Sequence, residues 1–217
     1  METRTDSWRI RQLKTPRAAA VAGVAFALLF AVAVVLIRTA VPDTLTGETE
    51  WVEREAGRIN LAMMLMPLAG IAFLWFVGVI RDQLAESEDR FFSTVFLGSG
   101  LLFLAMVFVS MSIAGGIVAG GVAFPERPLD EDVILFGRAV MLQISNVYAL
   151  RMAGVFMTSL STIWLRTGVM PRWLGVITYV LATALLLVIN LSLWVTLIFP
   201  AWVLFVSVFI LVRQLRF

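Results

Sequence analysis

Uncharged, strongly apolar runs of about twenty residues recur along this chain, and shorter segments between them hold most of its charges. The first run, residues 18–37, contains no charged side chain. A helix of that length rises roughly 30 Å, about the thickness of the hydrocarbon core of a bilayer. Lipid cannot hydrogen-bond to the backbone, and a helix satisfies its own backbone groups. The pattern therefore predicts an all-α integral membrane protein.

We expect a single transmembrane domain over residues 1–217, folded as a six-helix bundle. Hydrophobic residues make up 60% of the chain and charged residues 15%, which leaves no stretch for a separate soluble domain. A secretory signal peptide is a weaker interpretation of the first run, because its apolar region usually has about 7–15 residues. The expected spans are residues 18–37, 61–80, 91–113, 146–165, 174–189 and 195–212.

The third and fourth hydrophobic segments are longer than one crossing requires. Residues 91–124 carry no charge and hold a glycine-rich end, so we expect the third helix to loosen or protrude after residue 113. Residues 133–165 would form a helix roughly 50 Å long. Residues 133–145 either project from the membrane or lie at its outer interface, and we favour a projecting or tilted helix. Both long helices are expected to protrude on the outer side, while residues 48–60 are expected to form a short surface helix that leads into the second span.

The distribution of basic residues predicts the orientation. If the amino terminus is cytoplasmic, eleven basic residues lie inside and four outside. The inside set is Arg4, Arg9, Arg11, Lys14, Arg17, Arg81, Arg90, Arg166, Arg172, Arg213 and Arg216, and the outside set is Arg38, Arg54, Arg58 and Arg127. Cytoplasmic loops of membrane proteins are enriched in Lys and Arg, so both termini are predicted to be cytoplasmic.

Several kinds of chemistry are excluded or disfavoured by composition. The chain has no cysteine and no histidine, which removes disulfides, thiol nucleophiles and imidazole catalysis. No acidic residue falls within the six spans, so a proton relay is not expected there. Met63, Met64 and Met66 could suggest a Cu(I) site, but packing is the favoured interpretation. We expect no enzyme activity, no cofactor, no metal site and no nucleic-acid partner.

Arg151 is the candidate functional residue, because an arginine at membrane depth costs at least about 2.5 kcal/mol. One interpretation is a snorkelling side chain paired with an outer acid such as Glu53 or Glu55, or with carbonyls near residues 115–121. The other is an anion or lipid-headgroup site that also uses nearby polar side chains. That candidate ligand site comprises Arg151, Asn146, Tyr148 and Arg138.

Two pairs of small residues suggest close helix packing. Gly116 and Gly120 form one small-xxx-small pair, and Gly115 and Ala119 form another. A flexible end of the third helix explains the same glycines equally well.

The segment WLRTGVMPRWLG at residues 164–175 resembles a turn that recurs in a family of small bacterial multi-pass proteins of unknown function. The order of a basic leader, a long first outer loop, a charged inner turn and a long fourth helix is also similar over most of the chain. The resemblance implies a six-helix bundle with no assigned activity and no functional residue to carry over. Lys14 is the single lysine among 17 basic residues, a bias typical of GC-rich bacterial genomes, so we expect a bacterial plasma (inner) membrane.

Our leading functional hypothesis is a non-enzymatic membrane protein. It would act as an accessory to a membrane-protein partner or a second copy of itself, or bind a lipid or small amphiphile between its helices. The alternative is a small transporter or channel, which would need a polar pathway across the bundle.

Overall fold

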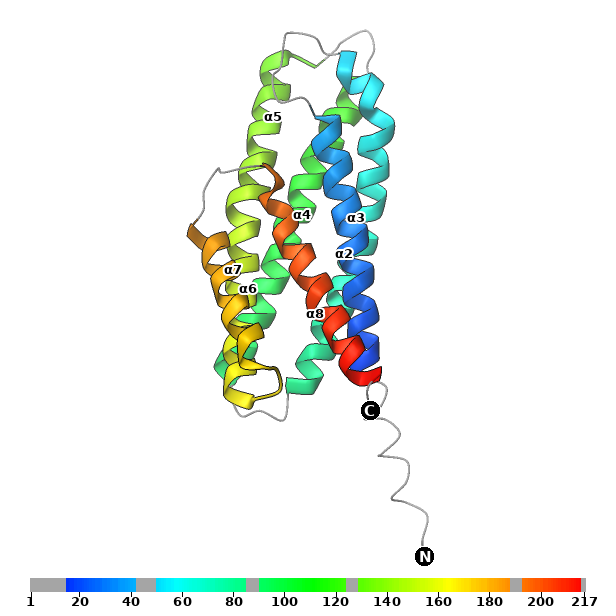
Figure 1. Cartoon of the computed structure of the whole chain (residues 1–217). Helices are drawn as coiled ribbons and strands as arrows, with labels where there is room; N and C mark the ends of the chain where they lie inside the picture. The colour runs from blue at the N-terminus through cyan, green and yellow to red at the C-terminus, as the bar shows by residue number, and fades with distance from the viewer. Residues whose placement is uncertain (1–14, 42–49, 85–89, 124–128, 188–192, 216–217) are drawn as a thin grey trace, which may run out of the picture.

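The computed structural model describes residues 15–41, 50–84, 90–123, 129–187 and 193–215, and every regular element within these ranges is helical (Figure 1). The elements are α2 (Thr15–Ala40), α3 (Glu50–Leu84), α4 (Arg90–Ala123), α5 (Glu131–Gln143), the π-helical segment η1 (Ile144–Ala149), α6 (Leu150–Thr167), α7 (Arg172–Leu187), the 3₁₀ segment η2 (Leu193–Leu197) and α8 (Ile198–Leu215). The all-α prediction is confirmed for the described residues.

Within the described residues, five helical stretches are long and apolar enough to cross a membrane: Arg17–Ala40, Arg54–Asp82, Phe91–Gly121, Glu131–Thr167 and Trp194–Arg213. The sixth apolar helix, α7, has 16 residues and rises about 24 Å, which is short of a full crossing. The expected fifth span, residues 174–189, ends outside the described residues. The chain therefore has the helices of a multi-pass membrane protein.

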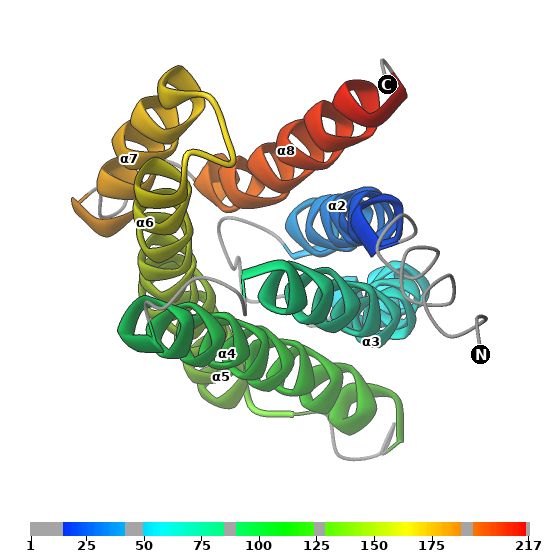
Figure 2. The same ribbon diagram turned by 90° about the horizontal axis from the view of Figure 1, so that it is seen from below.

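The helices pack as neighbours in the order α7, α6, α4, α3, α2 and α8. α2 lies between α3 and α8, α4 packs against α3 and α6, and α7 packs against α6. Seen along the bundle axis, α7 and α8 diverge at the end that carries the turn between α6 and α7 (Figure 2). At this end the ring of Trp173 on α7 contacts the rings of Phe205 and Phe209 on α8.

Aromatic rings from five helices fill the centre of the bundle. The ring of Phe73 on α3 lies 4.7 Å from Phe26 on α2, 5.6 Å from Phe103 on α4 and 5.5 Å from Phe156 on α6, measured between centroids. Phe199 on α8 lies 4.6 Å from Phe103. All five rings are at most 2% exposed. Tilted and edge-to-face pairs at these distances add roughly 0.5–1.5 kcal/mol each beyond area burial.

Polar side chains in the core form hydrogen bonds between neighbouring helices, either to a backbone carbonyl or to another side chain. Ser161 Oγ on α6 donates to the Gly175 carbonyl on α7 at 2.8 Å, and Trp202 Nε1 on α8 donates to Thr178 Oγ1 on α7 at 3.0 Å. Such bonds fix the register of neighbouring helices without placing a charge in the core.

The fourth hydrophobic segment forms one continuous helical stretch from Glu131 to Thr167, as we favoured over an interfacial segment followed by a separate span. Its first part, α5, extends beyond the carboxyl end of α7 (Figure 1). The position of this extension relative to the bilayer stays a prediction.

Two local predictions can be compared with the helix bounds. The short helix expected to lead into the second span is the beginning of α3, which runs unbroken from Glu50 through Pro67 to Leu84. Of the two alternatives for the glycine-rich end of the third segment, loosening is wrong, because α4 stays helical to Ala123, and protrusion from the membrane stays a prediction. Packing between neighbouring helices compensates the weak helix propensity of glycine in α4.

The four small residues singled out on α4 have different surroundings. A Cβ at Gly115 would lie 2.4 Å from Met63 Sδ on α3, so α3 and α4 approach closely there. A Cβ at Gly120 would lie 2.8 Å from Leu129 Cδ1. Gly116 has open space around it, and Ala119 is exposed.

Candidate functional site

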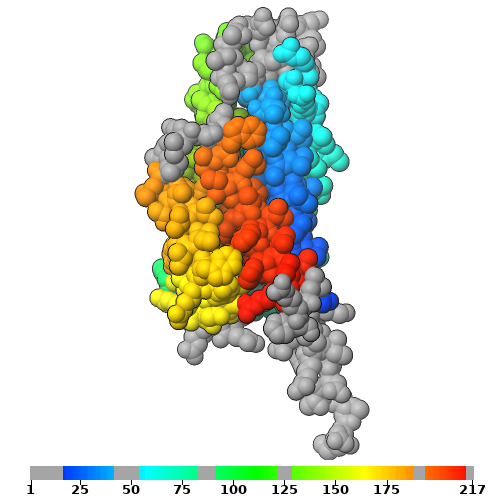
Figure 3. All heavy atoms as spheres, viewed as in Figure 1, coloured from blue at the N-terminus to red at the C-terminus, as the bar shows by residue number. Residues whose placement is uncertain are grey.

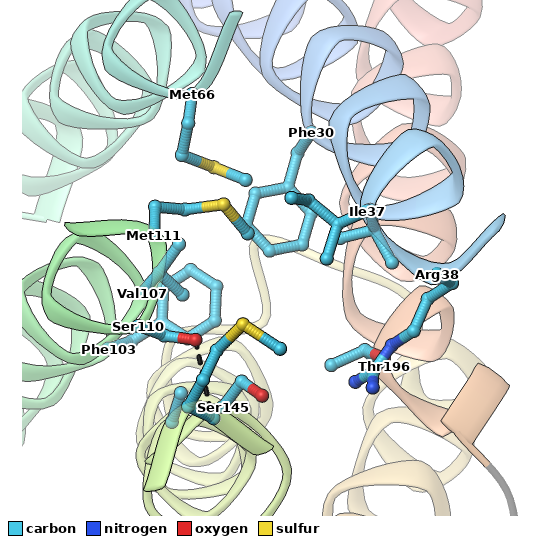
Figure 4. A pocket seen from close by; sticks show the side chains of 13 residues that line it. Phe30, Ile37, Arg38, Met66, Phe103, Val107, Ser110, Met111, Ser145 and Thr196 are labelled. Atoms are coloured by element: carbon cyan, nitrogen blue, oxygen red, sulfur yellow. Dashed lines mark hydrogen bonds between the residues drawn. The ribbon is translucent and has the colours of Figure 1, made fainter. Parts of the chain in front are cut away.

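A narrow internal cavity lies where α2, α3, α4, α5, η1 and η2 meet. Its volume is about 30 Å³, room for roughly two water molecules. The lining residues are Phe30, Val34, Ile37, Arg38, Met66, Phe103, Val107, Ser110, Met111, Met141, Ser145, Ala149 and Thr196. We refer to it as the Arg38 cavity (Figure 4).

The cation at the polar end of the cavity is Arg38, in the last turn of α2. Phe30, Val34 and Arg38 are spaced four residues apart, so they lie on one helix face and all three line the cavity. Arg38 Nη2 donates a hydrogen bond to Asn146 Oδ1 on η1. Figure 4 shows the guanidinium of Arg38 directed toward Thr196 of η2.

The wider turn of η1 forms the wall opposite Arg38. In a π-helix each N–H bonds to the carbonyl five residues earlier, and such single turns are often found at functional sites. Hydroxyl groups bind backbone carbonyls near the change from α-helix to π-helix. Ser110 Oγ on α4 donates to the Met141 carbonyl at 3.0 Å, and Ser145 Oγ donates to the Leu142 carbonyl at 3.3 Å. These two hydroxyl groups also line the cavity.

Two methionines separate the Arg38 cavity from a groove on the outside of the bundle. The groove lies between α3 and α4, has a volume of about 290 Å³ and is lined by Met63, Met66, Pro67, Phe108, Met111 and Ser112. Met66 and Met111 line both spaces. These two side chains form the wall that the two spaces share, and a methionine side chain has three rotatable bonds.

The lining combines an apolar wall with one guanidinium and three hydroxyl groups. None of the lining residues is acidic. A guanidinium presents five N–H donors in a planar fork that matches carboxylate and phosphate oxygens. The arrangement suits an anionic head at the Arg38 end and an apolar tail along the methionines.

The structure distributes the four sequence-predicted ligand residues over different environments. Asn146 lies beside the cavity and holds Arg38. Tyr148 is 52% exposed, and Arg138 is partly buried on α5. Arg151 is partly buried on α6 and makes no hydrogen bond or ion pair with any other described residue.

The expected acceptors for Arg151 can be checked in part. Glu55 forms ion pairs with Arg58 at 3.0 Å and with Arg54 at 3.9 Å, measured between nitrogen and oxygen. The side chain of Glu53 lies outside the described residues. A headgroup as the acceptor for Arg151 stays a prediction.

Arg38 is the site residue that the sequence interpretation missed. The sequence interpretation ended the first span at Ile37 and assigned Arg38 to an outer loop, whereas α2 continues to Ala40. The signal was its spacing: Arg38 falls four residues after Val34 and eight after Phe30, on the face that packs inward. An arginine that shares a helix face with buried residues at the end of a span must point toward a neighbouring helix. Its position therefore predicts a polar group on that helix.

Comparisons with protein-family models, with curated proteins and with solved structures gave no match. The resemblance of residues 164–175 to a bacterial family therefore stays a prediction.

Proposed function

We propose that this chain is a non-enzymatic multi-pass protein of the bacterial plasma membrane that binds a single-chain amphiphile with an anionic head. The head would occupy the Arg38 end of the cavity, and the chain would run between Met66 and Met111 toward the groove between α3 and α4. The proposal includes six spans with both termini in the cytoplasm. The observation that carries it is the guanidinium of Arg38, held by Asn146 at the end of an apolar cavity.

The depth of Arg38 in the bundle supports this assignment. Arg17 and Arg38 mark the two ends of the apolar part of α2, and their Cα atoms are separated by about 32 Å of helix. That length matches the hydrocarbon thickness of a bilayer. Arg38 then lies at the outer boundary, the depth at which the head of an amphiphile lies.

The small volume of the Arg38 cavity means that side chains must move before an acyl chain can enter it. Space for about two water molecules is too small for an acyl chain. Rotation of Met66 and Met111 would join the cavity to the groove of about 290 Å³ that opens beside it. The ligand would stabilise the rotated side chains of Met66 and Met111 through its apolar contacts.

The centre of the bundle favours binding over transport. A transporter or channel needs polar groups along its path. Below the Arg38 cavity, the described part of the bundle is filled by Phe26, Phe73, Phe103, Phe156 and Phe199, all at most 2% exposed. An amphiphile can enter sideways from the bilayer without passing these rings.

Native mass spectrometry of the purified protein in a mild detergent tests the proposal, with lysophosphatidylglycerol as the anionic probe and lysophosphatidylcholine as the zwitterionic one. Arg38→Gln should weaken binding of one lysophosphatidylglycerol about 10- to 100-fold, since hydrogen bonds to charged groups contribute about 1.5–3 kcal/mol. Arg54→Gln is the matched control, because Arg54 is exposed near the start of α3.

Equal binding of both probes, or identical binding by the Arg38 and Arg54 variants, would refute the amphiphile site. Counterflow of a solute in proteoliposomes would instead support the transport alternative.

A further inference from the structure

A second and larger groove lies at the opposite end of the bundle, between the turn that joins α6 to α7 and the last turns of α8. It has a volume of about 550 Å³ and is lined by Gly168, Met170, Pro171, Trp173, Phe209, Val212 and Arg213. In Figure 3 the turn between α6 and α7 (yellow) and the last turns of α8 (red) lie side by side on one face of the molecule. We refer to it as the Arg213 groove.

The turn that forms one side of the groove is fixed by backbone and side-chain bonds. Gly168 has φ +67°, a left-handed conformation that ends α6, and its N–H donates to the Trp164 carbonyl at 3.0 Å. Arg213 Nη1 donates to the Val169 carbonyl at 2.7 Å, which ties the end of α8 to this turn. The bond uses one of the five guanidinium N–H donors and holds the charge at the rim of the groove.

Aromatic and aliphatic side chains form the rest of the groove. Trp173 packs edge-to-face on Phe209, with ring centroids 5.8 Å apart, yet it remains 48% exposed. Val212 is also exposed. Beyond the groove, the outward faces of α7 and α8 present further exposed apolar side chains, namely Val176, Ile177, Val180, Phe205 and Val208.

We propose that the Arg213 groove binds the phosphate headgroup of an anionic diacyl phospholipid in the cytoplasmic leaflet. The guanidinium of Arg213 would bind the phosphate. Arg172, exposed at the start of α7, adds a positive charge between the lining residues Pro171 and Trp173 in the sequence. Trp173 lies at the headgroup level, where amphipathic aromatic rings are enriched, and the acyl chains lie along the apolar faces of α7 and α8. The choice of leaflet rests on the orientation in the proposed function.

The lining favours a lipid over a soluble phosphate. A site for a free anion needs several polar donors around it, whereas six of the seven lining residues offer apolar surface and Arg213 supplies the charge. Basic grooves between transmembrane helices on the cytoplasmic side are the sites at which acidic headgroups bind.

The test is a titration of the full chain in detergent with dioleoyl phosphatidylglycerol, followed by native mass spectrometry, with dioleoyl phosphatidylcholine as the comparison. Arg213→Gln should bind phosphatidylglycerol about fivefold more weakly, the effect of one interfacial charge. Arg213→Lys should keep most of the affinity. Arg81→Gln is the matched control, because Arg81 is exposed at the end of α3 on the same side.

A groove-filling variant keeps the test decisive if the Arg213 variant fails to fold. Val212→Trp retains the charge and places a large ring in the groove at an exposed position, so it should also lose phosphatidylglycerol. Unchanged binding by Val212→Trp, equal binding of the two phospholipids, or displacement by glycerol 3-phosphate alone would overturn the proposal. Arg38→Gln should leave the binding of phosphatidylglycerol unchanged. Failure of the headgroup site at Arg213 can therefore be distinguished from failure of the amphiphile site at Arg38.

Discussion

Replacement of Gly23 by alanine should loosen the contact between α2 and its two neighbours. An ideal Cβ at Gly23 would lie 2.0 Å from Ser207 Oγ on α8 and 2.8 Å from Phe76 Cδ2 on α3. Both neighbouring side chains are fully buried, so neither can swing into open space. α2 must then move away from α8, from α3, or from both.

The expected loss follows from the size of this overlap. Extra methyl groups in a well-packed core cost about 1–3 kcal/mol, and the higher helix propensity of alanine offsets at most about 1 kcal/mol. Ser207→Gly removes the closer contact but leaves Phe76 in place, so the double variant should recover part of the loss and give a coupling energy of roughly 1 kcal/mol.

Unfolding in mixed micelles with increasing sodium dodecyl sulfate measures the free-energy difference. Gly78→Ala is the control on α3, since a Cβ there meets nothing within 4 Å. If Gly23→Ala unfolds at the same detergent fraction as Gly78→Ala, the close packing of α2 against α8 and α3 is refuted.

Three further predictions concern register, charge and topology. Ser161→Ala should lower the free energy of unfolding by about 1 kcal/mol in the same assay, because it removes the bond to the Gly175 carbonyl; no loss would contradict a role for that bond. Arg151→Leu should leave stability unchanged or raise it, since Arg151 makes no hydrogen bond or ion pair with the other described residues, and a loss above about 2 kcal/mol would contradict this. Single cysteines placed in residues 81–90 should react with membrane-impermeant maleimides only after permeabilisation, and those in residues 38–60 before it; the reverse order would exclude cytoplasmic termini.

The helices were predictable from the sequence because long apolar runs leave few alternatives. The described helices cover most of each expected span. Helix ends were less predictable, since apolarity decides where a chain enters lipid but does not decide where a helix stops. α3 and α4 illustrate this, as both continue well past the expected spans.

The site was predictable only in part. A search for charge inside an apolar run finds Arg151, while Arg38 at the edge of a run resembles an ordinary flanking residue. Asn146 was assigned to a ligand site with Arg151, whereas its side-chain hydrogen bond in the structure comes from Arg38 on α2. Pairing between distant helices depends on how they pack, and periodicity along one helix reveals only which face turns inward. The π-helical turn of η1 also lacks a sequence signature such as proline.

The most direct test of the amphiphile site uses the absence of cysteine from the chain. Ser145→Cys would introduce a single thiol into the lining of the Arg38 cavity, and its rate of reaction with methyl methanethiosulfonate can be followed by mass spectrometry. Our account predicts that lysophosphatidylglycerol slows the reaction, that lysophosphatidylcholine does not, and that adding Arg38→Gln removes the protection. Equal protection by both lipids, no protection by either, or protection that survives Arg38→Gln would contradict an anionic head bound at Arg38.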